Sequence, residues 1–167
     1  APYLSQGGLG LPDVEYYTKN DSRSKEIRDK YLKHVANMFR LIDVPEETAE
    51  MYAQTIMKIE TDLAKSSNTR LENRDPEKNY NKMSIGNLKN ITGDFNWDLY
   101  FENLGLGKLD IVIVRQPEFF ANVGKMMDEV SLYDWKVYLK WNVIRDAASA
   151  LSTTFVNERF EFTGKFL

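Results

Sequence analysis

The chain has 167 residues, and its 25 acidic and 22 basic side chains give a formal net charge of −3. This length is sufficient for one domain with a hydrophobic core. The absence of cysteine excludes disulfides and thiolate metal sites, and the single histidine excludes a zinc site of several imidazoles. A nearly balanced charge argues against nucleic acid as a partner. No apolar run approaches the roughly 20 residues that cross a bilayer.

Two long helices are predicted in the first part of the chain, after a short helix that starts at Leu11-Pro12-Asp13 and passes through Tyr16 and Tyr17. Apolar residues recur at spacings of three and four over residues 24–41 and again over residues 45–65, where Pro45 suits the first helical position. Only a few residues join the two segments, so we expect them to form an antiparallel hairpin.

The middle of the chain is predicted to be less regular. Residues 66–83 have no helical period and are expected to form an ordered surface loop. Short helices are predicted at 85–91, with Ser84 as the N-cap, and at 97–104. The run Ile111-Val112-Ile113-Val114 predicts one strand, for which the chain offers no obvious partner.

The last third of the chain is predicted to be helical. A helix from Pro117 through Met127 precedes the segment that organises the prediction, residues 131–151, for which Ser131 is the expected N-cap. This segment is apolar over most of its circumference, which indicates burial on most sides by this chain or by another. A final helix is expected to run through Phe155 and Phe162 and to end near Gly164.

Few side chains offer catalytic chemistry. We interpret His34 as a histidine at the surface or boundary of its helix, and the acids Glu47 and Asp62 as solvated or salt-bridged. Glu60 is the exception, because it follows Ile59 close to the apolar face and a buried glutamate needs a partner. Arg70 or Arg74 is the expected cation, and we hypothesise that replacing Glu60 with Gln lowers the melting temperature.

The aromatic residues admit two interpretations, either core or the lining of a peptide groove, and helical spacing favours core. The residues concerned are Trp97, Tyr100, Phe119, Phe120, Trp135, Tyr138 and Trp141.

Several segments together resemble the amino-terminal helical domain of the neprilysin-like zinc metallopeptidases, peptidase family M13. They occur in family order over essentially the whole chain. They are Gly8-Leu9-Gly10-Leu11-Pro12-Asp13 with Tyr16-Tyr17, Arg74-Asp75-Pro76 with Tyr80-Asn81-Lys82-Met83, Phe95-Asn96-Trp97, Trp141, Leu151-Ser152 and Phe162-Thr163-Gly164-Lys165.

The resemblance implies a mainly α fold with long antiparallel helices and one short β segment, in which residues 1–167 are a single helical domain cut from a larger lid domain. The family's H-E-x-x-H zinc motif is absent, since Met38 stands where a second histidine would follow His34. We therefore assign no catalytic, cofactor-binding or metal-binding residue to this chain. Zinc is implied only for the parent enzyme.

The function implied by the resemblance is that of a non-catalytic lid that admits small peptides to a metalloendopeptidase. The expected partner is the catalytic domain of the same polypeptide, and the expected setting is a bacterial, exported protein. No membrane-spanning segment and no nucleic-acid partner are expected. The alternative is a stand-alone helical interaction module without enzymatic activity.

Overall fold

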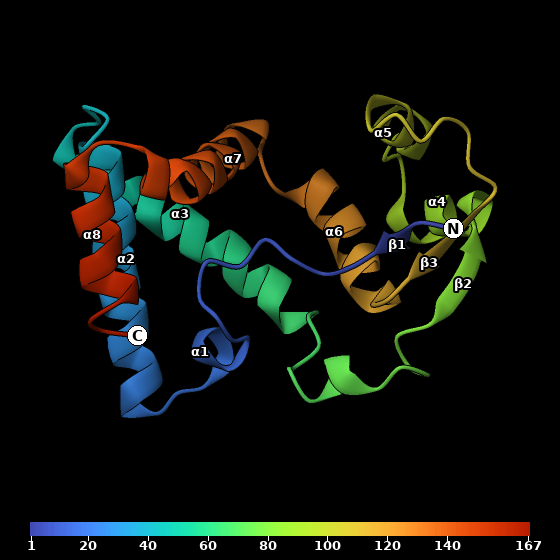
Figure 1. Ribbon diagram of the computed structural model, residues 1–167, viewed down its shortest axis with the longest axis horizontal. Coiled ribbons are helices and arrows are strands. Elements are labelled where there is room, and N and C mark those ends of the chain that lie inside the picture. Colours follow the sequence, from blue (N-terminus) through green and yellow to red (C-terminus); the bar gives the residue numbers. More distant parts are fainter. The chain divides into compact units, whose positions relative to one another are not determined.

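The computed structural model describes all residues from Ala1 to Leu167. Eight α-helices and one three-stranded sheet make the fold mainly α, as predicted (Figure 1). The chain divides into two compact units. Unit 1 comprises Ala1–Gly7 and Leu63–Val130, and unit 2 comprises Gly8–Asp62 and Ser131–Leu167. In neither unit does a helix combine the length and the apolar character needed to cross a membrane.

Unit 2 is entirely helical, and its helices follow the predicted segments closely. They are α1 (Glu15–Thr18), α2 (Ser22–Arg40), α3 (Glu46–Lys65, with its last turn in unit 1), α7 (Leu132–Ala147), which continues into a 3₁₀ turn (Ala148–Ala150), and α8 (Thr153–Thr163). The backbone N–H of Asp134 donates to the side chain of Ser131, which confirms the predicted cap of α7.

The two long helices α2 and α3 are antiparallel, as predicted. Phe39 near the end of α2 packs against Tyr52 in the first half of α3, with ring centroids 5.2 Å apart. In the other direction, Tyr31 in the middle of α2 donates a hydrogen bond to Glu60 near the end of α3. The end of α2 therefore contacts the first half of α3, and the middle of α2 contacts the end of α3, as in an antiparallel pair.

The last helix, α8, lies beside α2 (Figure 1). His34 on α2 stacks on Phe162 of α8 with ring centroids 4.8 Å apart. Phe166 follows α8, and its ring centroid lies 4.6 Å from the guanidinium of Arg23 on α2. Aromatic contacts therefore hold the chain's last turn on the first half of α2.

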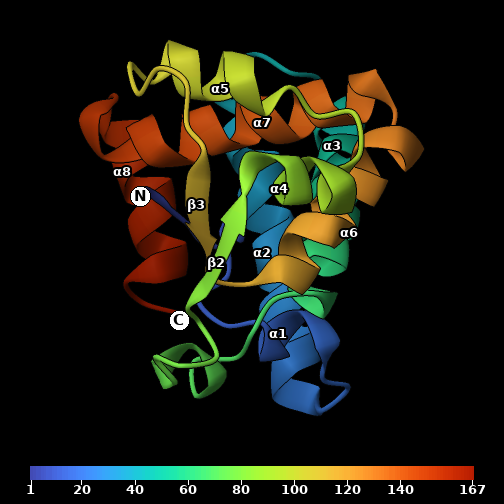
Figure 2. The ribbon, with the colours of Figure 1, turned by 90° about the vertical axis from the view of Figure 1, so that its right-hand side faces the viewer.

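Unit 1 contains the sheet. Its elements are β1 (Tyr3–Leu4), a 3₁₀ turn (Glu72–Arg74), β2 (Asn81–Ser84), α4 (Ile85–Thr92), α5 (Trp97–Asn103), β3 (Ile111–Val114) and α6 (Pro117–Glu129). The strand order is β1-β3-β2. Figure 2 shows β2 and β3 side by side, with α4 directly after β2.

The expectation that strand 111–114 lacks a partner is wrong, because the chain supplies two. β1 pairs with β3 in parallel, with Leu4 opposite Val114, and β2 pairs with it antiparallel, with Ser84 opposite Ile111. A central strand buried on both faces reads as a continuous apolar run, and Val112, Ile113 and Val114 are all buried. The prediction of an irregular loop over 66–83 is correspondingly wrong at its end, where β2 begins.

A buried amide explains why the rest of that loop is ordered. Gln116 accepts a hydrogen bond from the backbone of Gln6 (2.9 Å) and donates to Asn73 (2.7 Å) and Asn79 (3.2 Å). The segment after β1, the loop and the start of α6 are thereby joined through one side chain.

The helices α4 and α6 pack at Gly124, where any added Cβ would lie 2.5 Å from the carbonyl oxygen of Thr92.

Burial of α7 on most sides was predicted, by this chain or by another, and this chain supplies it on one face only. Val137, Tyr138, Trp141 and Ile144 are buried and form one face. On the opposite face Leu132, Leu139 and Val143 are 58–70% exposed. The helix is therefore apolar on both faces, and unit 2 covers only one of them.

Candidate functional site

A fully buried carboxylate lies at the centre of unit 2. Glu60 on α3 has no exposed surface, and the residues around it come from α1, α2 and α7. Burying an isolated charge is costly unless hydrogen bonds compensate for the lost water. This cluster is therefore the strongest candidate for a built polar site in the chain.

Two phenols donate to the two carboxylate oxygens. The hydroxyl of Tyr17 donates to Oε2 of Glu60 at 2.6 Å, and the hydroxyl of Tyr31 donates to Oε1 at 2.9 Å. Behind them, Nε1 of Trp141 donates to the Tyr31 hydroxyl at 3.0 Å. Each phenol therefore accepts from one side and donates towards Glu60, so the chain of donors ends at one acceptor.

The same cluster fastens the glycine-rich segment Gly8–Leu11. The Tyr17 hydroxyl accepts from the backbone N–H of Gly10 (3.1 Å) and of Leu11 (2.8 Å). The Tyr138 hydroxyl donates to the carbonyl of Gly8 at 2.7 Å. Two backbone N–H groups and one backbone carbonyl of the segment are thus held by phenols. These bonds explain how a segment without secondary structure follows a defined path.

Glycine is required at position 10 of this segment. A Cβ at Gly10 would lie 1.8 Å from the hydroxyl oxygen of Tyr31, much closer than any van der Waals contact permits. Nη1 of Arg145 also donates to the carbonyl of Leu9 at 3.2 Å. The backbone approach and the buried carboxylate are therefore parts of one arrangement.

Burial shifts the pKa of the Glu60 carboxyl and of the three phenols around it. It raises the pKa of the Glu60 carboxyl above its usual value, while the hydrogen bonds from Tyr17 and Tyr31 and the charge of Arg145 oppose that rise. Burial and the adjacent carboxylate raise the pKa of Tyr17 and Tyr31 well above the usual range. They raise the pKa of Tyr138 to about 12. The phenols consequently keep their protons and act as donors.

The arginines expected to pair with Glu60 are replaced by these tyrosines. Arg70 or Arg74 was the expected cation, whereas both carboxylate oxygens receive phenol donors and the cation that favours the ionised form is Arg145. The sequence signal for burial was correct. The signal for the partners lay in Tyr17 and Tyr31, whose hydroxyls sequence periodicity does not orient.

His34 is also more deeply buried than expected. Only 5% of its surface is exposed, so the interpretation as a surface or boundary histidine is wrong. Its Nδ1 lies 3.0 Å from Oε1 of Glu158, and Oε2 of the same carboxylate accepts from the Asn37 side chain at 3.2 Å. Burial alone would raise the pKa of Glu158, but the bonds from His34 and Asn37 outweigh it and lower that pKa. This histidine joins α2 to α8.

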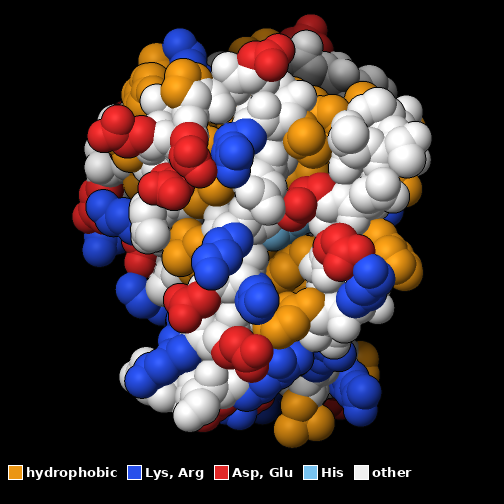
Figure 3. All heavy atoms as spheres, turned by 90° about the vertical axis from the view of Figure 1, so that its left-hand side faces the viewer, with side chains coloured by type: hydrophobic (Ala, Val, Ile, Leu, Met, Phe, Trp, Pro, Cys, Tyr) orange, Lys and Arg blue, Asp and Glu red, His pale blue; other side chains and the backbone are white.

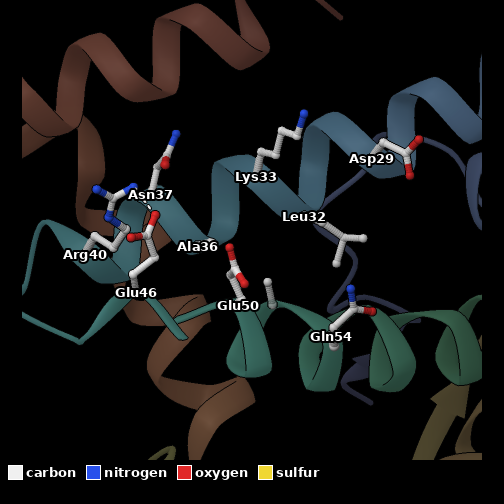
Figure 4. A pocket seen from close by; sticks show the side chains of 10 residues that line it. Asp29, Leu32, Lys33, Ala36, Asn37, Arg40, Glu46, Glu50 and Gln54 are labelled. Atoms are coloured by element: carbon white, nitrogen blue, oxygen red, sulfur yellow. Dashed lines mark ion pairs between the residues drawn. The ribbon is translucent and has the colours of Figure 1, made fainter. Parts of the chain in front are cut away.

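An open groove of about 580 Å³ lies between α2 and α3 in unit 2. Figure 4 shows Lys33 and Asn37 of α2 on one side and Glu50 of α3 on the other. Arg40 and Glu46 form an ion pair of 3.4 Å at one end. Charges of both signs line it, and it presents no nucleophile paired with a base.

The remaining candidates do not form a site. The side of the molecule with α2 and α8 mixes acidic and basic side chains (Figure 3), and Glu47 is exposed, as expected for a solvated acid. No group of three or more His, Asp or Glu side chains could hold a metal ion. Of the aromatic set, the buried members support the interpretation as core, and Tyr100 is 41% exposed. The buried members are Trp97, Phe119, Phe120, Tyr138 and Trp141.

Comparisons with known proteins place this arrangement in a family. The sequence matches peptidase family M13 over residues 1–167. It is 26% identical to an endothelin-converting enzyme homolog of Locusta migratoria over an alignment of 163 residues that covers 91% of this chain and 22% of the relative. It is 24% identical over 163 residues to neprilysin-3 of Drosophila melanogaster, covering 91% of this chain and 21% of that protein.

Solved structures give the same result. The open state of the zinc metalloprotease Zmp1 of Mycobacterium tuberculosis superposes on 99% of this chain with a TM-score of 0.92 and 30% identity. PepO of Lactobacillus rhamnosis shares the fold, with a TM-score of 0.77 and 14% identity. The chain spans about a fifth to a quarter of the length of these proteins. The matched proteins come from animals and from bacteria, so the match does not separate a bacterial source from a eukaryotic one. The chain belongs to peptidase family M13 and is a segment of its N-terminal domain.

Proposed function

We propose that residues 1–167 are part of the non-catalytic helical lid of a larger zinc metalloendopeptidase that cleaves small peptides. The observation that carries the proposal is the superposition on Zmp1, which covers 99% of this chain but only 26% of that zinc metalloprotease. We propose that the 167 residues form part of one lid domain, and that the lid limits access by size. In this proposal the chain supplies shape, while the catalytic groups lie elsewhere in the parent.

The chemistry of the described residues fits that division. A catalytic zinc usually has three protein ligands and an open position. The only histidine is buried between α2 and α8 with its Nδ1 facing Glu158, and both oxygens of Glu60 are occupied by phenols. These residues do not fit a catalytic zinc. The ligands of the proposed metal would belong to the remainder of the parent polypeptide, which is also the proposed partner of this chain.

The proposed setting is outside the cytoplasm. One relative, 25% identical over 175 residues, bears the name membrane metallo-endopeptidase-like 1 (Mus musculus). A parent of that kind would meet peptides at a membrane surface or in an extracellular fluid. We propose small peptides as its substrates, with their sequences to be identified.

The test compares the full-length parent with the 167-residue chain. A fluorogenic short peptide should be hydrolysed by the parent, should resist hydrolysis after chelation, and should be cleaved again after zinc is restored. The isolated chain should hydrolyse nothing, with or without zinc. Hydrolysis by the pure 167-residue chain, whether or not it needs zinc, would refute the division of roles.

The lid role needs a second substrate. The same cleavage sequence placed inside a long unfolded polypeptide should be cleaved far more slowly by the parent than the short peptide. Equal rates on both would refute size gating and leave the peptidase assignment intact. An open reading frame that stops soon after Leu167 would favour the stand-alone interaction module instead.

A further inference from the structure

The uncovered face of α7 carries three exposed apolar side chains, with Lys136 between the first and the second along the helix. Leu132, Leu139 and Val143, which we call the α7 stripe, are 70%, 58% and 69% exposed. At about 100° per residue, positions i, i+7 and i+11 fall on one side of a helix. Single exposed leucines are ordinary, but three aligned on one helix form a surface of the kind that other elements cover.

The stripe has a basic flank. Lys136 and Lys140 lie along one side of it on the same helix, both are exposed, and neither forms an ion pair within this chain. The buried face of α7 is already filled by the core of unit 2, where Trp141 has no exposed surface. The stripe is thus separate from the face that stabilises unit 2.

A second copy of the chain is a poor occupant when the two α7 helices run antiparallel. In an antiparallel pairing of two α7 helices across a twofold axis, each flank meets the same flank of its partner. Lys136 and Lys140 would then face the same lysines, which is destabilising. A partner with acidic residues beside an apolar ridge fits both the stripe and its flank.

We propose that the α7 stripe docks an amphipathic helix of the parent polypeptide, one that lies outside these 167 residues and carries acidic residues facing Lys136 and Lys140. The inference rests on the proposed function, because it requires a longer polypeptide. The proteins that this chain resembles are long enough to supply such a helix. The chain covers at most 26% of the relatives and structures named above. The 11-residue span from Leu132 to Val143 is about 16 Å of helix, enough for three turns of a partner.

Thiol labelling tests the proposal directly, because the chain has no cysteine. Val143→Cys is made in the 167-residue chain and in the full-length parent, and alkylation at position 143 is followed by peptide mass spectrometry. The reaction should be fast in the isolated chain and about tenfold slower or more in the parent, where reaction would require the interface to open. Urea-unfolded parent gives the reference rate for an accessible thiol.

Two further variants test whether the alkylation rate at position 143 reports docking at the α7 stripe. Met51→Cys places a thiol at a comparably exposed apolar position of unit 2, 65% exposed, and reports whether the isolated chain leaves such sites open. Lys136→Glu together with Lys140→Glu should speed alkylation of the position-143 thiol in the parent, because the charge reversal weakens docking. If alkylation is not faster in this variant, the partner carries no acidic residues that face Lys136 and Lys140.

The outcomes separate this inference from the proposed function. Equal alkylation of the position-143 thiol in the chain and in the parent overturns the docking surface, even if the parent hydrolyses peptides. A protected thiol in a parent without peptidase activity keeps the docking surface and overturns the peptidase. Protection that already occurs in the isolated chain and fades on dilution assigns the stripe to a second copy and overturns the proposal.

Discussion

Replacing Tyr31 with Phe tests whether the donor chain that ends at Glu60 stabilises unit 2. The substitution keeps the ring, which packs against Trp141 and Phe162 with centroid distances of 6.1 and 5.7 Å. It removes only the hydroxyl. Oε1 of Glu60 then loses its donor and Nε1 of Trp141 loses its acceptor, and both groups are buried.

The magnitude follows from the two groups left unpaired. A buried polar group without its partner costs about 1–3 kcal/mol, and more when it is charged. Two such groups suggest a loss of roughly 3 kcal/mol once some relaxation is allowed. For a chain of this size, a loss of that kind corresponds to a fall in melting temperature of about 6–12 °C. The pKa of Glu60 should also rise further, because one of the bonds that lowers it is gone.

The assay is thermal and urea unfolding followed by far-ultraviolet circular dichroism, with Tyr52→Phe as the matched control. Tyr52 also loses a bond to a phenol, the 3.0 Å contact with Tyr133, but that pair is exposed to water. Its removal should change the free energy of unfolding by less than about 0.5 kcal/mol. If Tyr31→Phe is no more destabilising than Tyr52→Phe, the buried donor chain does not stabilise the unit and the reasoning above is wrong.

Three further substitutions follow from the same structure. Glu60→Gln should destabilise the chain by about 1–3 kcal/mol, since one of the two oxygens that accept from the phenols becomes an NH2 group that cannot accept. Because the folded pKa of Glu60 is raised, the folded chain binds more protons between the unfolded pKa and the raised value. Wild-type stability contributed by Glu60 therefore grows as pH falls through that window, and urea melts should show the gap to the variant widening. Gly10→Ala should lower the melting temperature through its clash with Tyr31, as measured by calorimetry. Gly124→Ala should cost about 1–3 kcal/mol in denaturant melts, because its Cβ meets the backbone of Thr92 rather than a movable side chain.

Two glycines in open surroundings serve as controls for the last two. An added Cβ meets nothing within 4 Å at Gly7, and at Gly86 only the Ser84 side-chain oxygen at 3.7 Å, an ordinary contact. Gly86→Ala lies within α4 and should be neutral or slightly stabilising, because alanine is the better helix former. Losses at these positions as large as those at Gly10 and Gly124 would show that the effect of alanine is general and not steric.

Periodicity and capping chemistry predicted most of the helices. The i, i+3, i+4 spacing gave α2 and α3, and the Ser131 cap gave the start of α7, because these signals are local to the segment that they describe. The burial of His34 was also within reach. It lies three residues after Tyr31 and one before Val35, and therefore on the apolar face of its helix.

The sheet and the cluster around Glu60 depended on distant partners, and there prediction failed. β2 consists of Asn-Lys-Met-Ser, which has little strand propensity, and it forms only because β3 lies beside it. Tyr17 and Tyr31 were placed as helix residues, yet the direction of their hydroxyls is set by Glu60, 43 and 29 positions away. For α7 the apolar sequence predicted burial but could not tell which of its two faces the same chain covers.

The geometry around Glu60 decides its role. A general base needs a lone pair within reach of the proton that it removes, together with access for a substrate. Here one phenol occupies each carboxylate oxygen, Tyr17 also holds Gly10 and Leu11, and no surface of Glu60 is exposed. The raised pKa of Glu60, in another setting a sign of catalysis, is here the consequence of burial in a structural junction. The carboxylate anchors the path of the Gly8–Leu11 segment across three helices, so its contribution to a peptidase would be the fixed shape of the unit that carries it.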